Sequence, residues 1–482
     1  MRFAILMSVS VIGLSGCANL GGLSKFKPEP TNIVVQDIAL QQQKWAETAP
    51  EDLPTTDWVG SFDDRILSSL VAEALDANSN VKSSAARLDA AQARFRISRA
   101  DKLPTLDTNS RITRTETSLP FQTPTNLSSG VQANWEVDLW GRIKNGIKSD
   151  KIAVDASRAD YAGARLSIAG QVAQGWFDLI EARLLSELSA RDVDTLERAL
   201  RLTQRRFEGG VTESSDVRLA RSSVANAKAL QATRQQSLAA LTRNLEVLLH
   251  RYPTDELEAA QDLPSLPPLS GVGTPGYVLR KRPDLLAAEQ RLYAQGLQID
   301  VARKNLLPRL TLTGNGNLSS TTFAEFLDID ALAIQLAANF SAPLFQGGRL
   351  KGNVEQQEAI LREQLENYAG VALNAYLEVE NAIEAEQRLL ERETALRTSV
   401  DESRKAEDRL ETRYTEGLAT ILQLLDAQSR RISAEGQLIS ARKERLSNRV
   451  RMHVALGGGF ETGLDSSTFV VASHRNFNSL TP

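Results

Sequence analysis

The stretch VQANWEVDLWGRIK, residues 131–144, contains two kinds of hydrophobic pattern. Apolar and polar residues alternate without a break over 131–139, and this period of two predicts a strand. The alternation stops at Gly141, and no proline follows until Pro253. A similar stretch, NFSAPLFQGGRLK, occurs at 339–351. We therefore expect a strand, a glycine turn and a long helix at two places in the chain.

Two long runs of the chain, 125–252 and 344–481, contain no proline. Because proline lacks an amide hydrogen and clashes with the preceding helical turn, proline-free runs can form long helices. Apolar residues recur in both runs at steps of three and four, which predicts amphipathic helices with coiled-coil-like packing. A helix from about 142 to 207 would be roughly 95 Å long at 1.5 Å per residue. No small globular domain can enclose it.

The two halves of the chain match one another in order. Residues 80–106 match 284–310, residues 138–144 match 343–351, and residues 206–210 match 413–417. Three ordered matches at a nearly constant offset indicate an internal two-fold repeat. Each half is then expected to contain a helix, two strands, a long helix, a glycine turn and a final helix.

These patterns define the expected domains. They are a lipoprotein signal peptide (1–16), a lipidated tail (17–60), the first repeat (61–252), a proline-rich linker (253–283), the second repeat (284–456) and a C-terminal tail (457–482). The first repeat is expected to hold a strand pair at about 105–140 and a hairpin tip near 209–213. In the second repeat the corresponding positions are about 309–345 and near 416–420.

The N-terminus indicates a lipid anchor. Arg2 precedes a short apolar segment, 3–14, which ends in Leu-Ser-Gly before Cys17, the single cysteine of the chain. This resembles a bacterial lipobox, in which the cysteine becomes lipidated after cleavage; the alternative is an ordinary signal peptide with a chance cysteine. Ala18 stands where inner-membrane lipoproteins carry aspartate, so we expect an anchor in the outer membrane, extending into the periplasm.

The strands are expected at 105–117, 128–140, 309–320 and 330–345. Segments of this length that alternate between apolar and polar residues suit an outer-membrane barrel, although a soluble sheet with one face on a core has the same pattern. The lipobox and the lack of a globular core favour the membrane. In hydrocarbon the edges of a four-stranded sheet would leave backbone groups unpaired, so several copies of the chain must close a barrel together.

Composition and motifs argue against catalysis. The net charge is −4, which suggests no nucleic-acid partner, and the three histidines lie far apart without metal-ligand spacing. No Gly-x-Ser-x-Gly motif occurs, and the sequence from Gly347 to Gly352 lacks the Gly-Lys-Ser/Thr ending of a phosphate loop. We expect no enzyme activity, no cofactor and no metal, and interpret Gly347-Gly348 as a strand-to-helix turn.

Several motifs, taken together, carry a resemblance to a known family. They are Trp58 with Phe62-Asp63-Asp64, Arg282-Pro283-Asp284-Leu285, Leu307-Pro308, Asp138-Leu139-Trp140-Gly141-Arg142, Pro343-Leu344-Phe345 with Gly347-Gly348-Arg349, Arg413-Tyr414 with Gly417, and Leu424-Leu425-Asp426-Ala427-Gln428. The chain resembles the TolC-type outer-membrane efflux channels, in particular the lipidated outer-membrane factors of tripartite drug exporters.

The resemblance implies a mixed fold of α-helices and membrane β-strands. Its form would be a homotrimer in which a twelve-stranded outer-membrane β-barrel continues into a long periplasmic α-helical barrel. Its role would be a passive exit duct for drugs or other small molecules. The implied partners are a periplasmic adaptor (membrane fusion) protein, an inner-membrane pump, here expected to be proton-driven, and outer-membrane lipid. Two alternatives stay open: an exit duct for type I protein secretion, and a periplasmic adaptor or coiled-coil scaffold lipoprotein.

The resemblance also implies roles for individual residues. The strand-to-helix junctions would be Trp140, Gly141, Gly347 and Gly348; the tip turns that contact the adaptor would be Gly209, Gly210 and Gly417; the periplasmic gate would contain Asp216, Tyr414, Leu422 and Asp426. A ring of three Asp426 carboxylates would attract cations. Gln423 and Ala419 depart from members that carry aspartate and arginine there. The alternative explanation is the helix dipole for Asp216 and amphipathic packing for Tyr414.

Overall fold

The computed structural model describes residues 44–46, 57–118, 121–122, 125–269, 271–326, 328, 330 and 332–459. Cys17, the expected signal peptide and most of both expected tails lie outside these residues. The chain divides into two compact units. The sheet unit contains Ala91–Val154 and Gln290–Glu366, and the helical unit contains Gln36–Ala90, Asp155–Glu289 and Asn367–Pro482.

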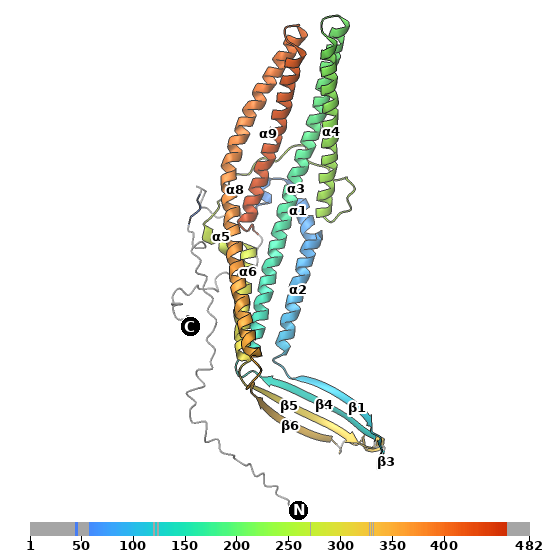
Figure 1. Ribbon diagram of the computed structural model, residues 1–482, viewed down its shortest axis with the longest axis vertical. Helices are drawn as coiled ribbons and strands as arrows, with labels where there is room; N and C mark the ends of the chain where they lie inside the picture. Colours follow the sequence, from blue (N-terminus) through green and yellow to red (C-terminus); the bar gives the residue numbers. More distant parts are fainter. Residues whose placement is uncertain are drawn as a thin grey trace, which may run out of the picture. The chain divides into compact units, whose positions relative to one another are not determined.

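The sheet unit is built around four antiparallel strands. They are β1 (Thr105–Arg114), β4 (Thr125–Val137), β5 (Arg309–Ser320) and β6 (Leu332–Ser341), in the spatial order β1-β4-β5-β6 (Figure 1). The central pair joins the two halves of the sequence, with Trp135 opposite Leu312 and Val131 opposite Gly316. Two short strands, β2 (Thr117–Ser118) and β3 (Phe121–Gln122), pair with each other, and α7 is Phe323–Phe326.

Three strands end earlier than predicted: β1 ends at Arg114 rather than at 117, and β4 and β6 end early for identifiable reasons. β4 ends at Val137 rather than continuing through Leu139, because the carboxylate of Asp138 accepts hydrogen bonds from the backbone amides of Ile143 and Lys144. β6 ends at Ser341, two residues before Pro343, which has no amide hydrogen to donate to a sheet. Both β4 and β6 therefore end a few residues before the next long helix begins.

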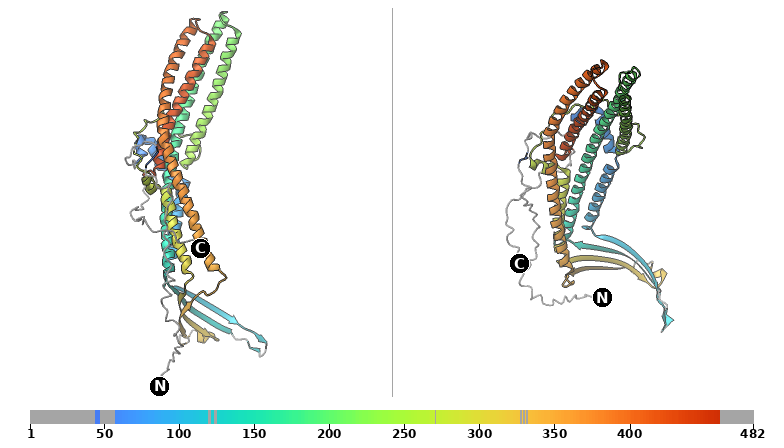
Figure 2. Two further views of the ribbon diagram at one scale, coloured as in Figure 1. Left: turned by 60° about the vertical axis from the view of Figure 1, so that its left-hand side comes forward. Right: turned by 45° about the horizontal axis from the view of Figure 1, so that its top comes forward.

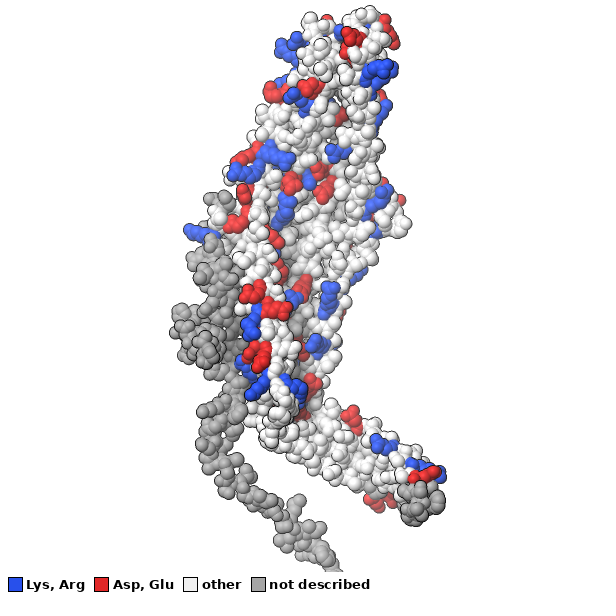
Figure 3. Space-filling model, viewed as in Figure 1, with Lys and Arg blue, Asp and Glu red and all other residues white. Residues whose placement is uncertain are grey.

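Apolar side chains of the sheet are exposed. Leu336 is 83% and Ile334 is 73% exposed on β6, and Leu106 on β1 is 73% exposed. On the face in view, charged side chains are fewer on the sheet than along the long helices (Figure 3). In sequence, β6 contains none, β5 has Arg309 at its first position and β4 has only Glu136, whereas β1 contains Asp107, Arg111 and Arg114. In the single chain, none of the other described residues covers these apolar side chains of β1 and β6.

The long helices occur as pairs of equal length. α3 (Arg142–Glu208) and α8 (Arg349–Thr415) each have 67 residues, and α4 (Ser214–Leu248) and α9 (Ile421–Ala455) each have 35. Before the strands, α2 (Ser79–Ala100) and α6 (Pro283–Lys304) each have 22 residues. Figure 2 shows α3 with α4 and α8 with α9 as two hairpins. Among the described residues, none of the helices has a stretch long and apolar enough to cross a bilayer.

The sequence analysis missed a 3-10 turn and three helices, one of which is α7 between β5 and β6. A 3-10 turn (Gly60–Phe62) and α1 (Arg65–Ala77) precede α2, and α5 (Pro275–Lys281) lies within the segment expected to be a linker. Proline at the first position of α5 is compatible with a helix because the amide it lacks has no partner there. Each of α1 and α5 is separated from the next helix by a single residue, Asn78 or Arg282.

Two motifs singled out in the sequence form the core of the helical unit. Trp58 and Phe62 are buried with Trp176 and Phe177 of α3, and the carboxylate of Asp64 both caps α1 and accepts a 2.8 Å hydrogen bond from Trp176 Nε1. Arg282 donates to both oxygens of Asp284, to Glu378 at 2.6 Å and to the carbonyl of Ala455 at 3.0 Å. These contacts fasten α6, α8 and α9 together.

Candidate functional site

Both hairpin tips begin with the same helix end. Gly210 has φ +74° and Gly417 has φ +81°, which is the left-handed region that glycine adopts without strain. The amide of Val211 donates to Arg206 O and that of Leu418 to Arg413 O, each at 2.8 Å. With the shorter-range bonds from Gly210 and Gly417, these form Schellman caps. The glycines Gly210 and Gly417 are therefore required by backbone geometry, whereas Gly209 has no positive φ.

The two tips differ where the second helix begins. At the start of α9, Thr420 Oγ1 accepts from the amide of Gln423 at 3.3 Å, and Gln423 Oε1 accepts from the amide of Thr420 at 3.0 Å. This capping box gives Gln423 a structural task at the position where some family members carry aspartate. At the start of α4, Glu213 makes no side-chain cap, and Asp216 in the first turn bonds to the hydroxyl of Thr212.

Tyr414 joins α8 to α3. Its side chain is 2% exposed, and its hydroxyl lies 2.9 Å from Thr203 Oγ1. The Arg206 guanidinium lies 4.8 Å from the centre of the Tyr414 ring and donates to the Tyr414 carbonyl. The structure thus groups Tyr414 with Thr203 and Arg206, two residues that the sequence analysis missed, whereas Asp216 is bonded within its own tip.

Leu422 and Asp426 stand on one exposed stripe of α9. They are four residues apart, and Arg430 follows after another four. Leu422 is 64% exposed and the Asp426 side chain is 60% exposed. Arg430 Nε donates to Asp426 Oδ2 at 2.8 Å, and this hydrogen bond raises the pKa of Arg430 above its ordinary value. Within the single chain, the charge of Asp426 is therefore partly balanced by a cation on its own helix.

A buried ionic cluster lies further along the hairpins from the tips. Arg431 of α9 donates to Asp192 of α3 at 3.0 Å, to Glu435 at 3.0 Å and to Glu407 of α8. Arg404 also contacts Glu435, at 2.5 Å. We call the set Asp192, Arg404, Glu407, Arg431 and Glu435 the three-helix charge cluster. Its charged residues occupy the apolar side of amphipathic helices. This position in the sequence pattern could have identified the three acids as buried charges.

The pKa values in the three-helix charge cluster reflect an excess of acids. Burial raises the pKa of Asp192 and of Glu407 above the ordinary carboxyl range, although Arg431 opposes both shifts. Burial alone would lower the pKa of Arg431, but Glu407, Glu435 and Asp192 outweigh it and raise that pKa. The Arg431 guanidinium is stabilised by three carboxylates. Asp192 and Glu407 share it, and among the described residues only Glu435 has a second partner, Arg404. The cluster therefore depends heavily on Arg431.

The chain passes from strand to helix through a glycine turn in each half. Gly141 has φ +73° between β4 and α3, and Gly347 and Gly348 have φ +56° and +83° between β6 and α8. Trp140 Nε1 donates to Pro308 O at 2.6 Å, and Trp135 Nε1 donates to Lys102 O at 2.9 Å. Both indole rings therefore bond to the segments that enter β5 and β1, which fixes the ends of the sheet.

The profile of the outer membrane efflux protein family matches residues 70–249 and 275–458, which is most of the chain in two separate segments. The chain belongs to this family. The resemblance seen in the sequence is thereby confirmed, and the efflux protein is an outer-membrane component of an export system. Membership also excludes the alternative of a periplasmic adaptor.

Individual relatives agree with this assignment. The efflux protein is 29% identical over 456 residues to the pyoverdine export outer membrane protein OpmQ of Pseudomonas putida, covering 92% of this chain and 95% of that one. It is 24% identical over 463 residues to the probable outer membrane lipoprotein SilC of Salmonella typhimurium, covering 94% and 98%. The open-state structure of the Neisseria gonorrhoeae MtrE outer membrane channel superposes with a TM-score of 0.79 at 26% identity, covering 90% and 98%.

Proposed function

We propose that the protein is the exit duct of a tripartite exporter and that three copies form it. The main support is the four-stranded sheet, whose apolar side chains are exposed and whose edge strands β1 and β6 each pair with one described strand only. In hydrocarbon each edge amide and carbonyl must be paired. Pairing β6 of one copy with β1 of the next satisfies both edges, and three copies supply twelve strands. The long hairpins α3–α4 and α8–α9 then line a helical tunnel.

The internal two-fold repeat is part of this proposal. Equal helix lengths in the two halves support it, as do the two separate segments matched by the family profile. An anchor on Cys17 is also proposed, with support from the lipobox and from the name of the lipoprotein relative SilC. The expected partners are a periplasmic adaptor at the tips around Gly209, Gly210 and Gly417, and an inner-membrane pump, expected to be proton-driven.

The proposal is tested by fractionation and export together. Outer-membrane fractions should contain a trimer whose migration changes on heating, and deletion of the protein should raise intracellular accumulation of exported small molecules. A monomer in the inner membrane would contradict the trimeric duct. Loss of a secreted protein with unchanged small-molecule accumulation would favour the type I secretion alternative.

A gate at the tips is proposed from the stripe that Leu422, Asp426 and Arg430 form on α9. Three copies would bring three such stripes around one axis. We expect Asp426→Ala to abolish block of single-channel current by divalent cations, because the carboxylates that attract cations are removed. Arg430→Gln should have the opposite effect and strengthen the block, because it frees Asp426 from its partner.

Single-channel recording in planar bilayers measures both variants against the wild type. Unchanged cation block in Asp426→Ala would show that Asp426 lies away from the conduction path. Tyr414 and Asp216 are proposed to hold the tip closed, Tyr414 through Thr203 and Arg206 and Asp216 through Thr212.

A further inference from the structure

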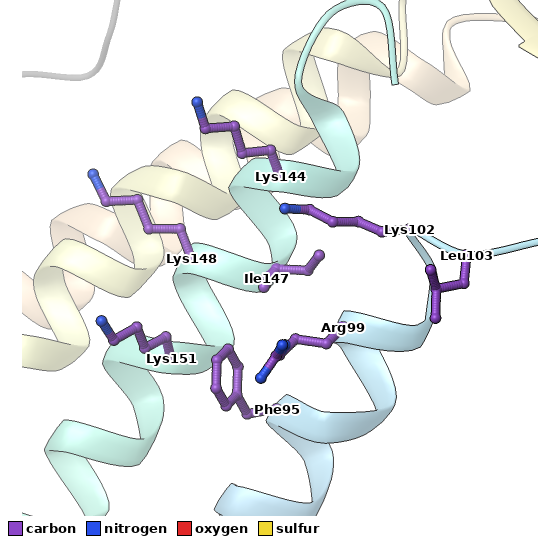
Figure 4. Close-up of a pocket in the computed structure, with 8 residues that line it drawn as sticks. All are labelled: Phe95, Arg99, Lys102, Leu103, Lys144, Ile147, Lys148 and Lys151. Carbon is purple, nitrogen blue, oxygen red and sulfur yellow. The ribbon is translucent and has the colours of Figure 1, made fainter. Parts of the chain in front are cut away.

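A cavity of about 440 Å³ in the sheet unit is lined mainly by cations. It lies between the end of α2 and the start of α3, beside the residues that enter β1 and follow β4 (Figure 4). Its charged lining consists of Arg99, Lys102, Lys144, Lys148 and Lys151. Figure 4 shows Arg99 and Lys102 on the α2 side and the three lysines in a row along α3. We call this set of five the basic pocket.

The spacing of these residues places them on facing helix stripes. Lys144, Lys148 and Lys151 follow the three- and four-residue steps of one face of α3, with the buried Ile147 among them. Phe95, Arg99 and Lys102 have the same spacing on the α2 side, and the Arg99 guanidinium lies 5.9 Å from the centre of the Phe95 ring. Phe95, Leu103 and Ile147 give the basic pocket an apolar floor.

The described residues give the basic pocket little internal compensation. Asp150 is engaged by Arg94 and Ser98, and Asp138 caps α3 through backbone amides. None of the five cations has a carboxylate within ion-pair distance among the residues that the structure describes. Five like charges around one cavity repel one another, so an anion from outside the chain would be bound favourably.

At two corresponding positions, the second half of the chain has acidic residues where the first half has lysines. Arg99 and Arg303 each stand one residue before the end of α2 or α6, and Lys151 and Glu358 stand at the same distance from the start of α3 or α8. Arg303 and Glu358 form an ion pair of 2.8 Å. Glu355 likewise occupies the place of Lys148. Where the second half has the Arg303–Glu358 ion pair, the first half has two cations, Arg99 and Lys151.

We propose that the basic pocket binds the phosphate-bearing headgroup of a lipid in the periplasmic leaflet of the outer membrane. The pocket lies where helices give way to the exposed sheet, which is the level of the headgroups if the sheet is in the membrane; to that extent the inference rests on the proposed function. Lysine and arginine near a membrane surface attract anionic headgroups. The apolar floor of Phe95, Leu103 and Ile147 suits the first carbons of an acyl chain, which free phosphate lacks.

The test measures binding of phosphatidylglycerol to the purified full-length protein in detergent by native mass spectrometry. Removing one cation should weaken binding about fivefold, which is the expectation for Lys148→Gln. Lys151→Glu should weaken it by about 25-fold, because it removes a cation and supplies Arg99 with the partner that Arg303 has in the second half. Lys351→Glu, the same charge change at the counterpart of Lys144, is the matched control and should leave binding unchanged.

Further binding measurements distinguish a lipid headgroup from free phosphate as the bound anion. Inorganic phosphate at equal concentration should fail to displace phosphatidylglycerol, and neutral diacylglycerol should bind without sensitivity to Lys151→Glu. Equal affinity in the wild type and Lys151→Glu, equal loss in Lys351→Glu, or displacement by phosphate would overturn the proposal. So would loss of the trimer in Lys151→Glu with unchanged lipid binding, because the pocket would then contact another copy. Absence of a heat-modifiable trimer in the wild type would instead count against the proposed function.

Discussion

Arg431→Met is expected to loosen the packing of α3, α8 and α9 at the three-helix charge cluster. The substitution keeps a long side chain but leaves Asp192, Glu407 and Glu435 without their shared cation. The Arg431 side chain is only 13% exposed, so water cannot replace the lost partner fully. Removing one member of a buried ionic group typically costs about 3–5 kcal/mol. Amide exchange around the three-helix charge cluster should then accelerate by about two to three orders of magnitude.

The neighbouring residue supplies the matched control. Arg430→Met removes the same side chain one position earlier, but Arg430 pairs with Asp426 in solvent, where ion pairs contribute little. Its amide exchange in α8 and α9 should match that of the wild type. Adding Asp192→Asn and Glu407→Gln to Arg431→Met should restore much of the protection, because the cost comes from uncompensated carboxylates. Equal exchange in Arg430→Met and Arg431→Met would refute this account.

The pH dependence of the same exchange gives a second readout. Burial raises the pKa of Asp192 and Glu407, so the folded hairpins hold protons on these groups more tightly than the unfolded chain does. Their contribution to stability is fully present below the ordinary carboxyl pKa and is lost as pH rises through the raised values. Protection, corrected for intrinsic exchange, should therefore be greater at about pH 5 than at about pH 8. In Arg431→Met the difference should grow.

The sequence predicted best the features that short-range chemistry decides. The helix expected over 142–207 is Arg142–Glu208, because glycine after one end and the Asp138 cap before the other are local signals. α5 was missed because proline density was interpreted as linker, although proline is favourable at the first position of a helix. β4 was extended too far because alternation alone does not show that Asp138 has already turned to cap α3.

Contacts between distant segments were harder to predict. Tyr414 was identified, but its partners Thr203 and Arg206 depend on which turn of α3 faces α8. The same holds for Arg431, whose charge was visible in the sequence while its three acids come from three helices. Periodicity gives the buried side of a helix but not the helix that covers it. The gating roles of Asp216, Leu422 and Asp426 and the anchor at Cys17 stay predictions.

Gly417→Val is expected to abolish most export while leaving the amount of trimer in the outer membrane unchanged. Gly417 has φ +81°, and a side chain in the left-handed region costs about 1–2 kcal/mol, more when it is branched at Cβ. Space is not the obstacle, since an added Cβ would lie 3.5 Å from its nearest neighbour, Arg206 Nη2. Relief of the strain must break the cap bond from Leu418 to Arg413, and this shifts the turn proposed to contact the adaptor.

Gly209 and Gly417 together separate backbone strain from side-chain bulk. Gly209→Ala adds a methyl group to the other tip at a residue without positive φ, and its Cβ would meet Arg205 O at an ordinary 3.4 Å. Export should therefore survive Gly209→Ala, fall in Gly417→Ala and fall further in Gly417→Val, as measured by intracellular drug accumulation at matched trimer levels. The difference between Gly209→Ala and Gly417→Ala follows from the left-handed φ, and the further fall in Gly417→Val follows from branching at Cβ. Full export in Gly417→Val would mean that the second tip tolerates a different turn and that the Schellman geometry at Gly417 is dispensable for assembly of the exporter.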